Sequence, residues 1–191
     1  MSMKNSKYTT LLMVVYTLVT VSSVAAELQR FDHQPTKGDG SLSILVVGDW
    51  GRRGLYNQSN VAFQMGKVGE KYDADFIIST GDNFYEDGLL DEEDDLFVES
   101  FTQVYTAPSL QKQWYSVLGN HDYRGNALAQ LSPVLTQKDR KWLCLRSFIV
   151  NSGLIKKGSL LFNFWKEQKG FSVWASKFDD NKKVIVSVRD Q

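Results

Sequence analysis

Three stretches of this chain share one pattern, in which an apolar run ends in glycine and then in a side chain that can bind a metal. They are Ile44–Trp50 (ILVVGDW), Phe76–Asn83 (FIISTGDN) and Trp114–Asp122 (WYSVLGNHD). A short apolar run rich in β-branched and aromatic residues predicts a buried strand, and glycine allows the sharp turn after it. Ligands of open α/β sheets bind beyond the carboxyl ends of the strands. The pattern therefore predicts a metal site at one sheet edge, formed by Asp49, Asp82 and Asn120.

The segments between these runs have the spacing of helices. Ser59 is expected to cap a helix that runs to about Tyr72. The inward face of this helix is expected to consist of Val61, Met65, Val68 and Tyr72. A second helix is expected over about 91–105, and its acidic start, Asp91–Asp95 (DEEDD), suits the positive end of the helix dipole.

The region that follows predicts a short helix after Gly125, broken at Pro133, and then one further strand over Trp142–Val150. Strands that alternate with helices indicate βαβ units and a mainly parallel start to the sheet. The expected fold class is therefore α/β.

Composition limits the range of functions. The chain has 191 residues, 42% of them hydrophobic, which is enough for one globular domain or a large part of one. The formal net charge is zero, so nothing indicates nucleic acid as a partner. Cys144 is the single cysteine, so an intrachain disulfide is excluded and a buried thiol is expected.

The first 26 residues have the organisation of a secretory signal peptide. Lys4 and Lys7 precede the apolar stretch Leu11–Val21, and small residues follow up to Ala26. The apolar stretch is short for a bilayer span, so an uncleaved signal anchor is the less favoured alternative. Secretion (to the extracellular space, the cell wall or the vacuole) makes Asn57 a candidate glycosylation site, because Asn57-Gln58-Ser59 is an Asn-x-Ser sequon.

The last 41 residues, 151–191, contain no strand that ends in a ligand, and glycines divide them into short pieces. They are expected to form a divergent, irregular tail, with Phe171–Phe178 and Val184–Val188 as a possible hairpin. Two origins are open: a genuine alternative end, or, as we favour, sequence continued through a splice boundary.

The blocks GDWG, GDNFY and GNHD, in this order and spacing, resemble the first three of five motifs of the purple acid phosphatases, which are calcineurin-like metallophosphoesterases. The short plant and mammalian (tartrate-resistant) type fits best, and the resemblance covers about 42–150. It implies the N-terminal half of a metallophosphoesterase β-sandwich with flanking helices. The last two motifs, which supply histidines, are absent, and the sequence holds only His33 and His121. The resemblance therefore indicates a C-terminally truncated form.

The resemblance also implies roles for individual residues. Asp49 and Tyr85 would bind Fe(III), Asp82 would bridge it to a divalent Zn, Mn or Fe ion, and the Asn120 amide would bind that second ion. Carboxylate and phenolate oxygens suit a hard, highly charged cation. His121 would contact the substrate phosphate or help to protonate the leaving group. The family needs seven ligand positions, and this chain supplies four of them.

Two functions follow from this comparison. The first is a secreted acid phosphatase that hydrolyses phosphate monoesters, without a stable membrane anchor. The second is a secreted, non-catalytic form that is at best a weak metal-binding or interaction module, because three imidazole ligands are missing. A related nuclease or protein phosphatase is disfavoured by Tyr85 and by the signal peptide.

Overall fold

The computed structural model describes residues 28–34, 37–38, 41–151 and 159–163, the last of these as backbone only. The expected signal peptide and the possible hairpin in the tail lie outside these residues. Within them, no helix is long and apolar enough to span a membrane.

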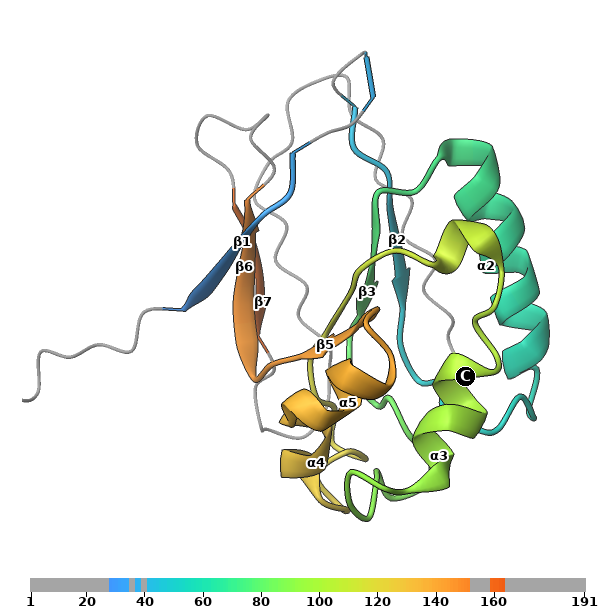
Figure 1. Cartoon of the computed structure of the whole chain (residues 1–191), viewed down its shortest axis with the longest axis vertical. Coiled ribbons are helices and arrows are strands. Elements are labelled where there is room, and N and C mark those ends of the chain that lie inside the picture. The colour runs from blue at the N-terminus through green and yellow to red at the C-terminus, as the bar shows by residue number, and fades with distance from the viewer. Residues whose placement is uncertain (1–27, 35–36, 39–40, 152–158, 164–191) are drawn as a thin grey trace, which may run out of the picture.

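The central element is a four-stranded parallel sheet in the order β2-β3-β4-β5 (Figure 1). The strands are β2 (Ile44–Val47), β3 (Phe76–Ser79), β4 (Trp114–Ser116) and β5 (Trp142–Cys144). Every residue of β3 and β4 is buried, as expected of inner strands covered on both faces. The strands predicted from the three apolar runs are therefore confirmed, and each ends a few residues before its candidate ligand.

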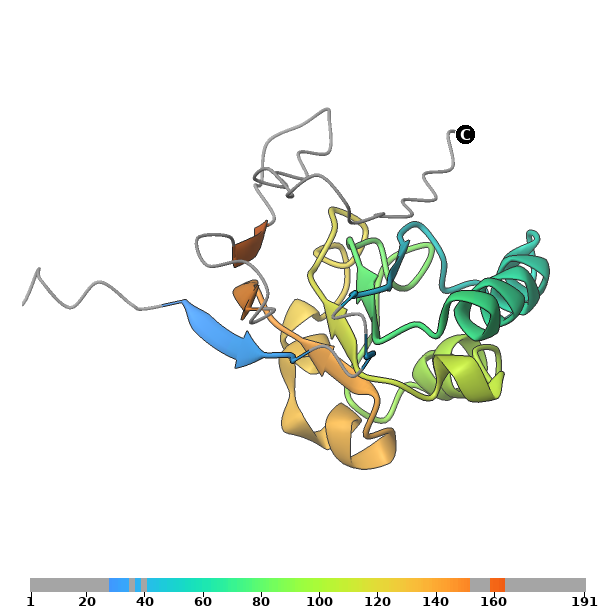
Figure 2. The same cartoon turned by 90° about the horizontal axis from the view of Figure 1, so that it is seen from above.

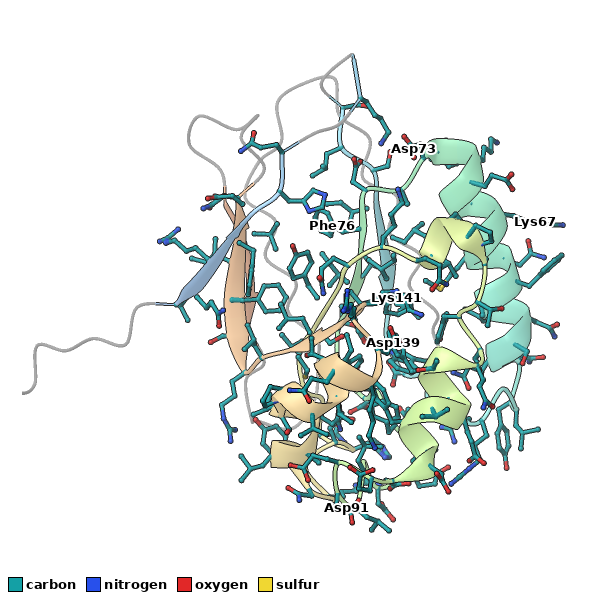
Figure 3. All side chains as sticks on the ribbon, in the orientation of Figure 1. Lys67, Asp73, Phe76, Asp91, Asp139 and Lys141 are labelled. Carbon is teal, nitrogen blue, oxygen red and sulfur yellow. The ribbon has the colours of Figure 1, made fainter. Side chains whose placement is uncertain are left out.

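Helices cover one face of this sheet, and a second sheet covers the other (Figures 1 and 2). The second sheet has the order β1-β6-β7, with β1 (Gln29–Asp32) parallel to β6 (Ser147–Asn151) and β7 (Ser159–Asn163) antiparallel to it. In Figure 3, Phe76 lies between the two sheets, where its ring packs 5.4 Å from that of Tyr115. The expectation of an α/β fold is confirmed.

The helical side of the sheet carries a large aromatic core. The helical elements are α2 (Gln58–Tyr72), α3 (Asp95–Phe97), the π-helical turn η1 (Val98–Thr102), the 3₁₀ turn η2 (Pro108–Leu110), α4 (Ala127–Leu131) and α5 (Pro133–Lys138). Trp50 stands at the centre of this core, within 5.2–6.3 Å of five other aromatic rings. Cys144 is buried beneath the same layer, as predicted, and burial raises the pKa of its thiol.

The predicted inward face of α2 is correct in part: Met65 and Val68 pack against the core and Val61 is half-buried. Tyr72 is 41% exposed, whereas the buried positions are Gln58, Ala62, Gly66 and Gly69. Small residues are needed here because the η2 segment lies against the helix: a Cβ on Gly66 would come within 2.7 Å of that of Ala107. Apolar spacing therefore found the side of the helix that faces the core, but it did not find the neighbouring small residues that close packing buries most deeply.

The predicted cap of α2 was wrong. Asn57, in a left-handed conformation, precedes the helix, and its side chain makes no capping hydrogen bond. Gln58 instead accepts the backbone N–H groups of Arg52 and Gly54 through Oε1. The Ser59 hydroxyl donates to the carbonyl of Gly54.

The second predicted helix is shorter than expected and begins later, at Asp95. Residues 91–94 form a turn in which the Asp94 carboxylate accepts the N–H of Leu96 and so caps the helix. Asp91 lies at the lower end of the molecule in Figure 3 and accepts the N–H of Glu93. The acidic run is therefore a helix start, as predicted. The short helix after Gly125 is also confirmed, as α4, with α5 beginning at Pro133.

Two strands replace the single one predicted over Trp142–Val150. β5 joins the four-stranded sheet and β6 the other, and Leu145 and Arg146 connect them. An apolar run does not show where a chain changes layers, because both strands are buried. In the segment expected to be irregular, residues 159–163 form β7, which corrects that expectation for these five residues. The domain boundary at residue 150 stays a prediction.

Candidate metal centre

The loops that follow β2 and β3 lie side by side and carry the two predicted carboxylate ligands. The N–H of Asp49 donates to the carbonyl of Gly81 (3.2 Å), and the N–H of Trp50 donates to that of Asp82 (3.2 Å). Both aspartates adopt left-handed backbone conformations, with φ of 58° at Asp49 and 49° at Asp82. Such conformations in residues other than glycine are uncommon and tend to cluster at functional sites.

Tyr85 joins the two carboxylates into a cluster of three oxygen-bearing side chains. Its hydroxyl donates to Asp49 Oδ1 at 2.6 Å and lies 3.3 Å from Asp82 Oδ2. Burial, aided by the neighbouring carboxylates of Asp49 and Asp82, raises the pKa of the hydroxyl. Two carboxylates and a tyrosine, whose phenol would become a phenolate on giving up its proton to bind a metal, supply hard oxygen donors of the kind that a cation such as Fe(III) prefers. The residues therefore fit a hard metal ion.

Glycine is required at two points where the site loops approach one another. A Cβ on Gly119 would lie 2.1 Å from Asp82 Oδ1, and one on Gly51 would lie 1.9 Å from the carbonyl oxygen of Asn83. No side chain fits at such distances. These two glycines thus allow the loops after β2, β3 and β4 to meet at one point.

His121 belongs to the same cluster. Its backbone N–H donates to Asp82 Oδ1 (2.9 Å), and its ring packs on that of Tyr85 with 4.4 Å between the centroids. Nδ1 lies 2.6 Å from the carbonyl oxygen of Glu86. A carbonyl can only accept, so Nδ1 carries the proton in this contact.

Asn120 is the least engaged of the predicted residues. It is exposed and directly follows Gly119, but its side chain forms no hydrogen bond with the other four within the described part of the chain. The structure thus brings Asp49, Asp82, Tyr85 and His121 together and leaves Asn120 beside them. The roles of all five residues remain predictions.

No group of three or more His, Cys, Asp or Glu side chains that could hold a metal occurs among residues 28–34, 37–38 and 41–151. The candidate cluster of this region instead combines two aspartates, Asp49 and Asp82, with a tyrosine, Tyr85. The sequence analysis recognised it because it included tyrosine and asparagine among the ligands.

Sequence reasoning missed Arg52. Its guanidinium lies 3.8 Å from the centroid of the Tyr85 ring and 5.2 Å from that of the exposed Tyr56, and it pairs with Glu86 at 2.6 Å. The only available signal was its position directly after the GDWG block. Arg52 places a positive charge beside the site.

Asp122 was also missed as a separate residue, although it ends the GNHD block. It is completely buried, and burial raises the pKa of its carboxyl to about 6, despite hydrogen bonds from Gly119, Gln130 and Asn83 that favour the charged form. A charged group so deep within the protein needs a structural or functional reason.

These loops match a known family. The calcineurin-like phosphoesterase domain matches residues 42–188, so the chain belongs to the calcineurin-like phosphoesterases. Within them it is similar to purple acid phosphatases. It is 62% identical to purple acid phosphatase 17 of Arabidopsis thaliana over 146 residues, which cover 76% of this chain and 42% of that protein. It is 61% identical to purple acid phosphatase 3 of the same plant, over 76% of this chain and 40% of the relative.

More distant similarities extend beyond plants. Human tartrate-resistant acid phosphatase type 5 is 39% identical over 111 residues, which cover 51% of this chain and 33% of the relative. The structure of GAP50, described as the anchor in the inner membrane complex of Plasmodium, aligns with a TM-score of 0.47 at 23% identity, over 62% of this chain and 39% of that one. The chain spans about two fifths of the length of the two Arabidopsis relatives.

Proposed function

We propose that Asp49, Asp82 and Tyr85 hold Fe(III) in a binuclear centre. The single observation that carries this proposal is the contact of the Tyr85 hydroxyl with both carboxylates. Asn120 would use its amide oxygen on a divalent Zn, Mn or Fe ion, with Asp82 shared between the two metals. Membership of the family, which implies a binuclear metal centre, supports this assignment.

The corresponding activity is that of an acid phosphatase that hydrolyses phosphate monoesters. A bound metal pair lowers the pKa of a water ligand and neutralises charge on the phosphate. His121 has its Nδ1 occupied by the carbonyl of Glu86, so Nε2 is the ring nitrogen suited to a phosphate oxygen or a leaving group. Similarity to proteins named purple acid phosphatases supports this activity.

The replacement Tyr85→Phe tests the iron assignment. It keeps the ring that packs on His121 but removes the hydroxyl, so the visible charge-transfer band of the iron-loaded protein should disappear. Absorption spectra after addition of Fe(III) give the measurement. Tyr123→Phe is the matched control, because Tyr123 lies on the neighbouring loop, outside the ligand cluster, and should leave the band intact. A visible band that survives in the Tyr85 variant would show that Tyr85 does not bind the iron.

The second candidate function, a non-catalytic metal-binding module, is favoured by the histidine count. The family resemblance implies three imidazole ligands, and the sequence contains two histidines, one of which, His33, packs against Phe76 instead. We expect the 191-residue polypeptide to show no measurable turnover of p-nitrophenyl phosphate at acidic pH. Turnover by rigorously purified polypeptide that is lost in Asp82→Ala would favour the first candidate over the second.

We also propose that the protein enters the secretory pathway, is cleaved after residue 26 and carries a glycan on Asn57. The described structure supports the glycan, since Asn57 is exposed at the start of α2. In a eukaryotic host, Asn57→Gln should remove one glycan mass, whereas Asn60→Gln, three residues on and outside a sequon, should not. Mass spectrometry and N-terminal sequencing give the measurement. An intact Met1 on a membrane-bound product would argue for a signal anchor instead.

A further inference from the structure

Each of the three site loops carries a buried side chain immediately after a candidate site residue. Trp50 follows Asp49, Asn83 follows Asp82 and Asp122 follows His121. The exposed fractions of these three following residues are 3%, 0% and 0%. They form one hydrogen-bonded set with two further fully buried residues, and we call this set the loop-linking network: Trp50, Ser79, Asn83, Asp122 and Gln130.

The hydrogen bonds of the network form a continuous chain. Trp50 Nε1 donates to the Ser79 hydroxyl (2.8 Å), which donates to Asn83 Oδ1 (2.5 Å). Asn83 Nδ2 donates to Gln130 Oε1 on α4 (3.1 Å), and Gln130 Nε2 donates to Asp122 Oδ1 (2.8 Å). One path of side chains therefore connects the loops after β2, β3 and β4.

The Asp122 carboxylate also holds the backbone of two of these loops. It accepts the N–H groups of Asn83 (2.9 Å) and Phe84 (3.2 Å) from the loop after β3, and that of Gly119 (2.7 Å) from its own loop. A buried carboxylate is tolerated only when it is well hydrogen-bonded, so its removal leaves several donors unpaired.

We propose that the loop-linking network is the positioning device of the metal centre. This inference rests on the proposed function. Consecutive residues share a peptide unit, so fixing Trp50, Asn83 and Asp122 inside the protein fixes the backbone of their neighbours at the site. A metal site needs its ligands held within about 0.5 Å of their binding positions. Loops hold them so closely only when neighbouring side chains fix the loop backbone. The five network residues are therefore positioning residues rather than ligands.

Ser79→Ala tests this role, with Ser116→Ala as a matched control. The two serines are register partners on β3 and β4, and both are fully buried. The Ser79 hydroxyl joins Trp50 to Asn83, whereas the Ser116 hydroxyl has no hydrogen-bond partner within the described part of the chain. Both variants delete one buried hydroxyl group, but only Ser79→Ala breaks the loop-linking network.

The first measurement is amide hydrogen exchange in the metal-free protein. Ser79→Ala should accelerate exchange of the Asp49 and His121 amides on the order of tenfold or more relative to the Ile77 amide inside the sheet. Ser116→Ala should leave these ratios unchanged. Equal acceleration of all three amides in Ser79→Ala would mean that Ser79 serves only global stability, and would overturn the proposal.

The second measurement is affinity for Fe(III), supplied as its citrate complex and expressed per folded molecule. Gln130→Met breaks the network from α4 without touching a ligand, and it should weaken binding roughly 10–100-fold, as loss of supporting residues does in metal sites. Leu135→Ala, a buried apolar truncation on α5, should lower stability but leave this affinity unchanged. Equal affinities in the two variants would refute positioning by Gln130. If the unmodified polypeptide binds no Fe(III) while the exchange pattern holds, the metal assignment fails and the network keeps its role in ordering the loops.

Discussion

Replacement of Asp82 by asparagine should reduce Fe(III) affinity of the polypeptide by more than about 100-fold. Asp82 is 4% exposed, and its two carboxylate oxygens face Tyr85 and the backbone N–H of His121. Asparagine keeps the shape, can still accept from His121 and tolerates the left-handed backbone that Asp82 adopts. The variant therefore removes the negative charge of the proposed ligand and little else. Loss of even a supporting residue costs roughly 10–100-fold in metal sites, so if Asp82 is the shared ligand that we propose, its loss should cost more.

Competition titration of the metal against a chelator measures this effect. Asp87→Asn is the control, because Asp87 is an exposed carboxylate on the same loop that pairs loosely with Arg124 at 3.6 Å. It should change affinity less than threefold. Metal binding by Asp82→Asn within threefold of the unmodified polypeptide would remove Asp82 from the ligand set.

Trp142→Ala should lower the free energy of unfolding by about 3–5 kcal/mol, the usual cost of deleting a fully buried tryptophan side chain. The ring is completely buried, packs 5.1 Å from Phe101 and 5.7 Å from Phe84, and donates from Nε1 to the carbonyl of Gln130. The substitution would therefore leave a large cavity beneath the site.

Urea denaturation followed by fluorescence or circular dichroism measures the loss. Phe63→Ala, on the outer surface of α2 where Phe63 is 59% exposed, should change the unfolding free energy by less than about 0.5 kcal/mol. A loss below about 1 kcal/mol for Trp142→Ala would mean that this core collapses to fill the space.

Local sequence was a good guide to the sheet strands that carry the site. Ile44–Val47 and Phe76–Ser79 are apolar runs closed by a glycine within a few residues, and this pattern located both strands and placed Asp49 and Asp82 at their carboxyl ends. The same reasoning was wrong over Trp142–Val150, because continuous burial conceals the point at which the chain leaves one sheet for the other. The strand β1 (Gln29–Asp32) was not expected either, since three of its four residues are exposed.

The sequence by itself determined where the strands end and which side chains follow them, because an apolar run closed by a glycine is a local sequence pattern. It also determined, by resemblance, that Tyr85 belongs with the two aspartates. Only the tertiary structure decided how these groups meet. Three features depend on segments distant in the sequence: the close approach of Gly119 to Asp82, the packing of Gly66 in α2 against Ala107, and the hydrogen bonds of Asp122. Such contacts are set by how whole layers pack, and no local pattern of polar and apolar residues encodes them.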